Sequence, residues 1–210
     1  MDDLLYYARG EERILEKPVL SPWFGCFCIL MSIAEFFMSH DIVYFSHGQE
    51  SGPWGAKIEY LAEIARRKGF EVESPDYSDL PDPEDRVRRL LEVASKDADR
   101  LVLVGSSAGG YVSAVASELL NPTGLFLLAP AVFLGGFGAR NPQPRGEHGW
   151  IVHGWNDEVV SAASVICFGG QHRMQLHLLN GDHRLMEVLP AIGELFDLFL
   201  DKVLGTEKRG

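Results

Sequence analysis

The sequence predicts a single α/β domain in which helices cover both faces of a mostly parallel sheet. Two observations lead to this fold class. Short apolar runs alternate along the chain with longer segments whose apolar residues recur at helical spacing, which is typical of parallel strands joined by crossover helices. The apolar runs are also continuous, as expected for strands that are buried on both faces. We therefore predict a three-layer α/β/α sandwich with a sheet of about six strands.

The strands and helices follow one another in a regular order from Asp41 onward. Six apolar runs are predicted as strands: Ile42–Phe45, Phe70–Ser74, Leu101–Val104, Leu125–Leu128, Trp150–His153 and Gln175–Leu179. Helices are predicted at Trp54–Lys68, Pro83–Ser95, Gly110–Leu120 and about Leu185–Leu204. The interval Pro130–Gly149 has neither pattern, so we expect a long irregular loop there, and loops of that length are usually functional.

Composition and charge exclude several classes of protein. The chain has 210 residues, which suits one domain with a sizeable core. Its net charge of −11 argues against nucleic acid or an anionic membrane surface as a partner, because both need a basic face. The cysteines (Cys26, Cys28 and Cys167) form neither a disulfide framework nor a zinc-binding spacing. We therefore expect no metal and a reducing cytoplasm.

Residues 1–37 differ from the rest of the chain. The apolar run Pro22–Phe37 contains Glu35 and is shorter than the ~20 residues of a membrane-spanning helix. The residues before it are acidic, unlike the basic leader of a signal peptide. Since Met38 resembles the natural start of a compact domain, we expect residues 1–37 to be an extension and 38–210 to be the domain. A membrane-peripheral anchor and an extra helix packed on the domain are the alternatives.

The segment G-S-S-A-G-G at residues 105–110 predicts a nucleophilic serine. Ser107 is the centre of a G-x-S-x-G motif between a predicted strand and a predicted helix, which is the context of a nucleophile elbow. The backbone N–H of Ala108 and the helix dipole would both stabilise an oxyanion there. Glycine-rich turns of this kind also bind phosphate. However, the lysine of a phosphate-binding loop is missing, because Tyr111 follows Gly110.

A base and an acid follow the serine in the order that this architecture requires. Asp157 comes just after the strand at Trp150–His153, and His183 comes just after the strand at Gln175–Leu179. Both are therefore expected at the carboxyl edge of the sheet, where open α/β sheets bind their ligands. Glu158 is the alternative acid. Asp182 is expected to cap the last helix instead.

Backbone and aromatic groups complete the predicted site. The pair His47-Gly48 follows the first strand, so the backbone N–H of Gln49 is predicted as the second oxyanion donor, although a plain glycine turn is the alternative. Large aromatic residues beside the loops are predicted to line a short substrate pocket, although each is as compatible with the core. These predicted substrate-binding residues are Trp54, Phe133, Phe137 and Trp155.

Four segments together resemble the α/β-hydrolase superfamily. They are S-H-G-Q (46–49), G-S-S-A-G-G (105–110), H-G-W-N-D-E-V-V (153–160) and G-D-H (181–183). The chain from about Met38 onward most resembles the small, lid-free bacterial serine esterases related to dienelactone hydrolases. The resemblance implies Ser107 as nucleophile, His183 as base, Asp157 as acid, and neither a lid domain nor a cofactor. Ser161 stands where such enzymes often have proline. The dienelactone hydrolases themselves use a cysteine nucleophile, so their substrate is not transferred to this chain.

The sequence thus predicts a serine hydrolase that cleaves a short- or medium-chain acyl ester in two acyl-transfer steps. Its partner is expected to be a small-molecule ester, with no nucleic acid and no stable membrane insertion. A thioesterase or an amidase with the same three residues is an alternative. A further alternative is a catalytically idle binding protein with the same fold.

Overall fold

A computed structural model describes residues 40–133, 138 and 141–206 of the protein. These residues contain a six-stranded sheet with the order β2-β1-β3-β4-β5-β6, and all adjacent strands are parallel. The strands are β1 (Asp41–Ser46), β2 (Glu71–Glu73), β3 (Arg100–Ser106), β4 (Gly124–Leu128), β5 (His148–Gly154) and β6 (Gln175–Leu179). The predicted α/β sheet is confirmed. The predicted extension at residues 1–37 lies outside the described residues.

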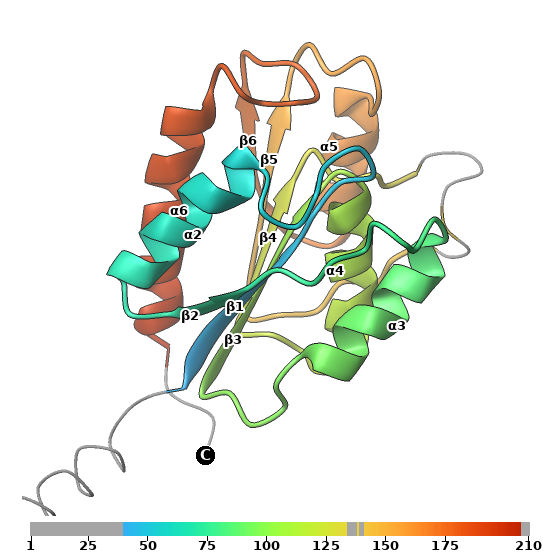
Figure 1. Ribbon diagram of the computed structural model, residues 1–210. Coiled ribbons are helices and arrows are strands. Elements are labelled where there is room, and N and C mark those ends of the chain that lie inside the picture. Colours follow the sequence, from blue (N-terminus) through green and yellow to red (C-terminus); the bar gives the residue numbers. More distant parts are fainter. Residues whose placement is uncertain (1–39, 134–137, 139–140, 207–210) are drawn as a thin grey trace, which may run out of the picture. The chain divides into compact units, whose positions relative to one another are not determined.

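Helices cover both faces of this sheet. They are α2 (Ala56–Arg67), α3 (Pro83–Val93), α4 (Ala108–Leu120), α5 (Ala162–Gln171) and α6 (Leu189–Leu204). Figure 1 shows α2 and α6 on one face and α3, α4 and α5 on the other, so the predicted three-layer sandwich is confirmed. In the part of the chain that the structure describes, no helix is both long enough and apolar enough to cross a membrane.

The core consists of two apolar layers, one on each face of the sheet. Along β3, Leu101 and Leu103 belong to the layer under α3, α4 and α5, whereas Val102 and Val104 belong to the layer under α2 and α6. The strand is therefore apolar at each position from Leu101 to Val104, because each face is covered. Burying one such side chain stabilises the fold by roughly 1.5–3 kcal/mol.

Helix α5 was not predicted from the sequence. Its apolar residues do not form a single stripe, since Val165 and Phe168 are buried while Ile166 is 43% exposed. The helix begins after Ser161, whose hydroxyl accepts a hydrogen bond from the backbone N–H of Ser164. Serine at this position is therefore the helix N-cap, and no proline is needed to end the preceding loop.

The last helix begins later than the sequence suggests. Helix α6 starts at Leu189, whereas the prediction placed its start near Leu185. Leu185 has a φ of 59°, a left-handed conformation that cannot continue an α-helix. The loop that follows β6 is longer as a result, and His183 lies within it.

The direction in which the chain winds through the sheet reverses between β1 and β3. The chain passes from β1 to the edge strand β2 and then returns over β1 to β3, so α2 and α3 lie on opposite faces. Ligands of open α/β sheets bind outside the carboxyl ends of the strands at such a point. Ser46 at the end of β1 is in register with Gly105 near the end of β3, so the loops after these strands start at the same level.

Candidate active site

Ser107 occupies a strained turn between β3 and α4. Its φ of 55° and ψ of −116° are unfavourable for a residue with a side chain, at a cost of order 1–3 kcal/mol. Backbone hydrogen bonds hold this conformation, the three shortest of which follow. The backbone N–H of Ser107 donates to Leu128, and its carbonyl oxygen accepts from Gly110 and Ala131, with donor–acceptor distances of 2.9, 2.9 and 3.0 Å. Ser107 is thus held at the carboxyl edge of the sheet, as the sequence predicts.

Close backbone contacts explain the small residues of the turn. A Cβ atom on Gly109 would overlap the carbonyl oxygen of Ser46, and a Cβ atom on Gly105 would overlap the carbonyl oxygen of Gly109. The first turn of α4 therefore lies directly against the ends of β1 and β3. This packing requires glycine at both positions.

Ser107, His183 and Asp157 form a continuous hydrogen-bonded series. The Nε2 atom of His183 is 2.9 Å from the Oγ atom of Ser107, and its Nδ1 atom is 2.8 Å from Oδ2 of Asp157. An ionised carboxylate only accepts hydrogen bonds, so Nδ1 carries the proton and Nε2 is free to accept one from the serine. Oδ1 of Asp157 accepts from the backbone N–H groups of Val159 and Val160 at 2.9 and 2.8 Å.

Backbone bonds hold the loops after β5 and β6 together. The N–H of Trp155 donates to the carbonyl of Leu179, and the N–H of Asn156 donates to the carbonyl of Gly181, at 2.9 and 3.0 Å. A Cβ atom on Gly154 would overlap that same carbonyl of Gly181. The loop with Asp157 is therefore fixed against the loop with His183.

The other acidic candidates lie outside the series. Glu158 is exposed, and the carboxylate that is hydrogen-bonded to Nδ1 of His183 is that of Asp157. Oδ1 of Asp182 accepts a hydrogen bond of 2.9 Å from the backbone N–H of Leu185, so Asp182 stabilises the turn before α6 rather than the first turn of the helix.

His153 lies behind Asp157 as a fully buried residue. Its Nε2 atom is 3.0 Å from the carbonyl oxygen of Val160 and 3.5 Å from Oδ2 of Asp157. Burial lowers the pKa of His153, so the ring is neutral at pH 7 and donates Nε2–H to Val160. The sequence placed His153 at the end of the predicted strand Trp150–His153, and it lies in β5.

A second buried histidine shapes the loop after β1. The Nε2 atom of His47 accepts the backbone N–H of Tyr77 at 3.0 Å, so Nδ1 carries the proton and donates to the carbonyl of Gly48 at 2.7 Å. Burial lowers the pKa of His47 and favours this neutral form. Gly48 lies close to Ser107, because a Cβ atom there would be 3.7 Å from that of the serine.

A pocket of about 560 Å³ opens above Ser107. Of the residues predicted for the site, Ser107, His183, Gln49 and Ala108 line it. The remaining lining residues are Gly48, Glu50, Ser51, Gly55, Ala56, Lys57, Ile58, Ser106, Ala131, Val159, Arg184 and Met186.

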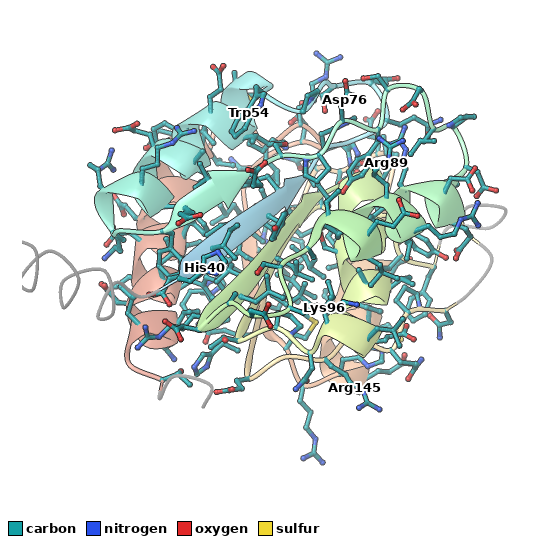
Figure 2. The ribbon with its side chains drawn as sticks, turned by 60° about the horizontal axis from the view of Figure 1, so that its bottom comes forward. His40, Trp54, Asp76, Arg89, Lys96 and Arg145 are labelled. Atoms are coloured by element: carbon teal, nitrogen blue, oxygen red, sulfur yellow. The ribbon has the colours of Figure 1, made fainter. Side chains whose placement is uncertain are left out.

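The predicted aromatic residues are not among those that line this pocket. Trp54 is 40% exposed and lies at the surface (Figure 2). The guanidinium carbon of Arg66 lies over its ring, 5.6 Å from the ring centroid. Phe133 packs edge-to-face on Phe168, and Trp155 is 57% exposed. Phe137 lies outside the described residues.

Lys57 is a site residue that the sequence analysis did not identify. It lies in the first turn of α2, lines the pocket, and donates a 3.0 Å hydrogen bond from Nζ to the Oγ atom of Ser106. Burial lowers the pKa of Lys57 to about 8. The sequence points to Lys57 as a site residue in one way only: it lies in the helix that directly follows the loop after β1.

Metal chemistry has no ready ligand set in this part of the chain. Residues 40–133, 138 and 141–206 contain no group of three or more His, Cys, Asp or Glu side chains that would hold a metal ion. The arrangement of Ser107, His183 and Asp157 is instead suited to nucleophilic catalysis, with the histidine as base and the aspartate as its orienting acid.

Comparisons with known proteins agree with this fold. The sequence pattern of the uncharacterised protein family UPF0227 matches residues 41–137, and no curated protein matches the chain. A lid-free α/β serine hydrolase from Xanthomonas campestris is 20% identical, with a TM-score of 0.57 over 79% of this chain and 84% of its own. Est1E from Butyrivibrio proteoclasticus is 15% identical, with a TM-score of 0.67 over 82% and 92%. The relationship to dienelactone hydrolases stays a prediction.

A third solved structure has a higher sequence identity to this chain than these two, and it shows the family. The crystal structure of a protein assigned to the α/β hydrolase superfamily, from Xanthomonas campestris pv. campestris, is 33% identical to this chain. The match covers 78% of this chain and 99% of that protein, with a TM-score of 0.72. The chain therefore belongs to the α/β hydrolase superfamily.

Proposed function

We propose that the protein is a serine hydrolase that cleaves short- or medium-chain acyl esters with Ser107 as the nucleophile. The observation that supports this most directly is the hydrogen-bonded series from Ser107 through His183 to Asp157, with its serine end in a pocket of about 560 Å³. A binding protein with the same fold would not need a serine held at a φ of 55° against a histidine.

In the first step, the Oγ atom of Ser107 attacks the ester carbonyl carbon while Nε2 of His183 takes its proton. Asp157 keeps the imidazole in the required tautomer and stabilises the imidazolium that forms. The carbonyl oxygen becomes an oxyanion, which the backbone N–H groups of Ala108 and Gln49 stabilise. One such donor contributes about 3 kcal/mol to transition-state stabilisation.

Breakdown of the tetrahedral intermediate releases the alcohol. His183 gives its proton to the leaving oxygen, and the acyl group stays on Ser107 as an ester. A water molecule then gives its proton to His183 and attacks this acyl-enzyme. The second intermediate collapses, the carboxylic acid leaves, and Ser107 regains its proton from His183.

The pocket favours a small substrate. Residues 129–147 connect β4 to β5, and their described part contains no helix or strand that would form a lid. Val159 and Met186 are exposed apolar residues of the pocket lining, at 58% and 44% exposure, and provide contacts for a short acyl chain. Ser107, His183 and Asp157 could also cleave a thioester or an amide, so the test includes one substrate of each kind.

The test compares the purified protein with its Ser107→Ala variant. Both are treated with a fluorophosphonate probe and assayed on p-nitrophenyl esters of increasing chain length, on a thioester and on an anilide. We expect labelling and ester turnover in the parent and a loss of both, by ~10⁶-fold in turnover, in the variant. A folded parent that neither labels nor hydrolyses any of these substrates would contradict the proposal and favour a binding protein.

A further inference from the structure

We propose that Lys57 is a specificity-determining residue that binds an anionic group, such as a carboxylate, on the substrate that Ser107 cleaves. This inference rests on the proposed function and narrows its substrate class to esters that carry a negative charge.

Lys57 shares the pocket with the reacting groups. Its side chain lines the same cavity as Ser107 and His183, and its ammonium group contacts Ser106, the residue next to the nucleophile. The Ser106 hydroxyl uses one of the three N–H donors of the ammonium group. The other donors are available to a ligand in the cavity.

The charge of Lys57 has no close counter-ion among the described residues. None of their carboxylates lies within 4.0 Å of its Nζ atom, although Asp157 and Asp182 are near enough to act on its charge. The bond to Ser106 is to a neutral hydroxyl. A partly buried cation without a paired anion is costly, and an anionic ligand would remove that cost.

Burial supports the same conclusion. Desolvation lowers the pKa of Lys57 to about 8, so the amine remains mostly protonated at pH 7 but its charge is poorly solvated. A poorly solvated cation forms a stronger bond with an anion than an exposed lysine does. By contrast, Arg184, the other cation of the pocket lining, is exposed.

The experiment compares two esters of matched shape. One is the mono-p-nitrophenyl ester of glutaric acid, which has a free carboxylate, and the other is the p-nitrophenyl ester of glutaramic acid, in which a neutral amide replaces it. Spontaneous hydrolysis is subtracted for both. We expect kcat/KM of the wild-type protein to be ~10–100-fold higher for the carboxylate ester, as one charge-assisted hydrogen bond allows.

Three variants locate the effect. Lys57→Met should reduce the preference to near one by lowering kcat/KM for the carboxylate ester, with a smaller change for the amide ester. Lys57→Arg should keep part of the preference for the carboxylate ester. Lys96→Met makes the same chemical change at an exposed lysine in the loop before β3, at the other end of the sheet (Figure 2), and should leave the preference unchanged.

A pH profile gives a second readout. kcat/KM reports the ionisation of the free enzyme, so the preference for the carboxylate ester should fall as pH rises through about 8 and Lys57 loses its proton. The amide ester is measured in parallel. Because ionisation of His183 affects both substrates alike, it cancels in the ratio of the two kcat/KM values. The charged and titratable groups that face Lys57 in the pocket or act on its charge are Glu50, Asp157, Asp182, His183 and Arg184.

Binding without turnover separates this inference from the proposed function. The carboxylate ester should bind the Ser107→Ala variant at least ~10-fold more tightly than it binds the Ser107→Ala, Lys57→Met double variant, by calorimetry. Equal affinities, or hydrolysis of both esters at equal kcat/KM, would overturn the role of Lys57 while leaving the esterase intact. Tight binding with no turnover by the parent would overturn the proposed function instead.

Discussion

Replacing Asp157 by asparagine should remove catalysis while leaving the fold in place. In the structure, Oδ1 of Asp157 accepts two backbone N–H groups at 2.9 and 2.8 Å, and Oδ2 accepts from His183 at 2.8 Å. The amide oxygen of an asparagine would keep the two backbone bonds, because only an acceptor fits there. Its NH₂ group would then face His183.

This exchange reverses the tautomer of the histidine. An NH₂ group donates, so Nδ1 of His183 would become the acceptor and the proton would move to Nε2, where it faces Ser107. A histidine protonated at Nε2 cannot take the serine proton. The expected loss is ~10⁴-fold in kcat at neutral pH, which corresponds to about 5 kcal/mol.

The assay measures kcat on p-nitrophenyl butyrate together with the free energy of unfolding. The matched control is Glu158→Gln, which makes the same change from carboxylate to amide at the exposed neighbouring residue, and its kcat should stay within about threefold of the parent. A folded Asp157→Asn variant with less than a tenfold loss would refute the assignment. A large loss in Glu158→Gln would transfer the role of acid to Glu158.

Two further predictions concern stability. Gly109→Ala should destabilise the protein by at least ~3 kcal/mol, because the new methyl group overlaps the carbonyl oxygen of Ser46. Gly170→Ala in α5 is its control, since a Cβ there meets nothing within 4 Å, and stable Gly109→Ala protein in urea unfolding would contradict the packing described. Ser161→Ala should cost about 1 kcal/mol, or a Tm decrease of ~2–4 °C by calorimetry, because it removes the N-cap of α5. An unchanged Tm would show that this cap does not contribute.

The sequence predicts most of the fold because its signals are local. Apolar runs at Leu101–Val104 and Leu125–Leu128 need cover on both faces, and the helical stripes between strands provide it. Where the local signal is weak, the prediction fails. Helix α5 has apolar residues on two faces, and the left-handed conformation of Leu185 delays the start of α6.

The same reasoning applies to the candidate site. Ser107, Asp157 and His183 each follow a predicted strand, and parallel strands end at one edge, so their common location can be predicted from chain order alone. The predicted aromatic residues have no position relative to a strand end that would fix where their side chains lie. Trp54 and Phe133 are near the right loops in sequence, but their neighbours Arg66 and Phe168 come from helices that only the tertiary structure brings to them.

The sequence by itself determined the layered α/β architecture and the three residues that meet at the edge of its sheet, because periodicity and strand order are properties of the chain. Only the tertiary structure decided which hydrogen bonds Asp157 accepts, which carbonyl groups exclude a side chain at Gly109, and which cation shares the pocket with the serine. These depend on the environment of each group. Lys57 is an ordinary helix residue in the sequence, and burial beside Ser106 is what makes its charge a feature of the site.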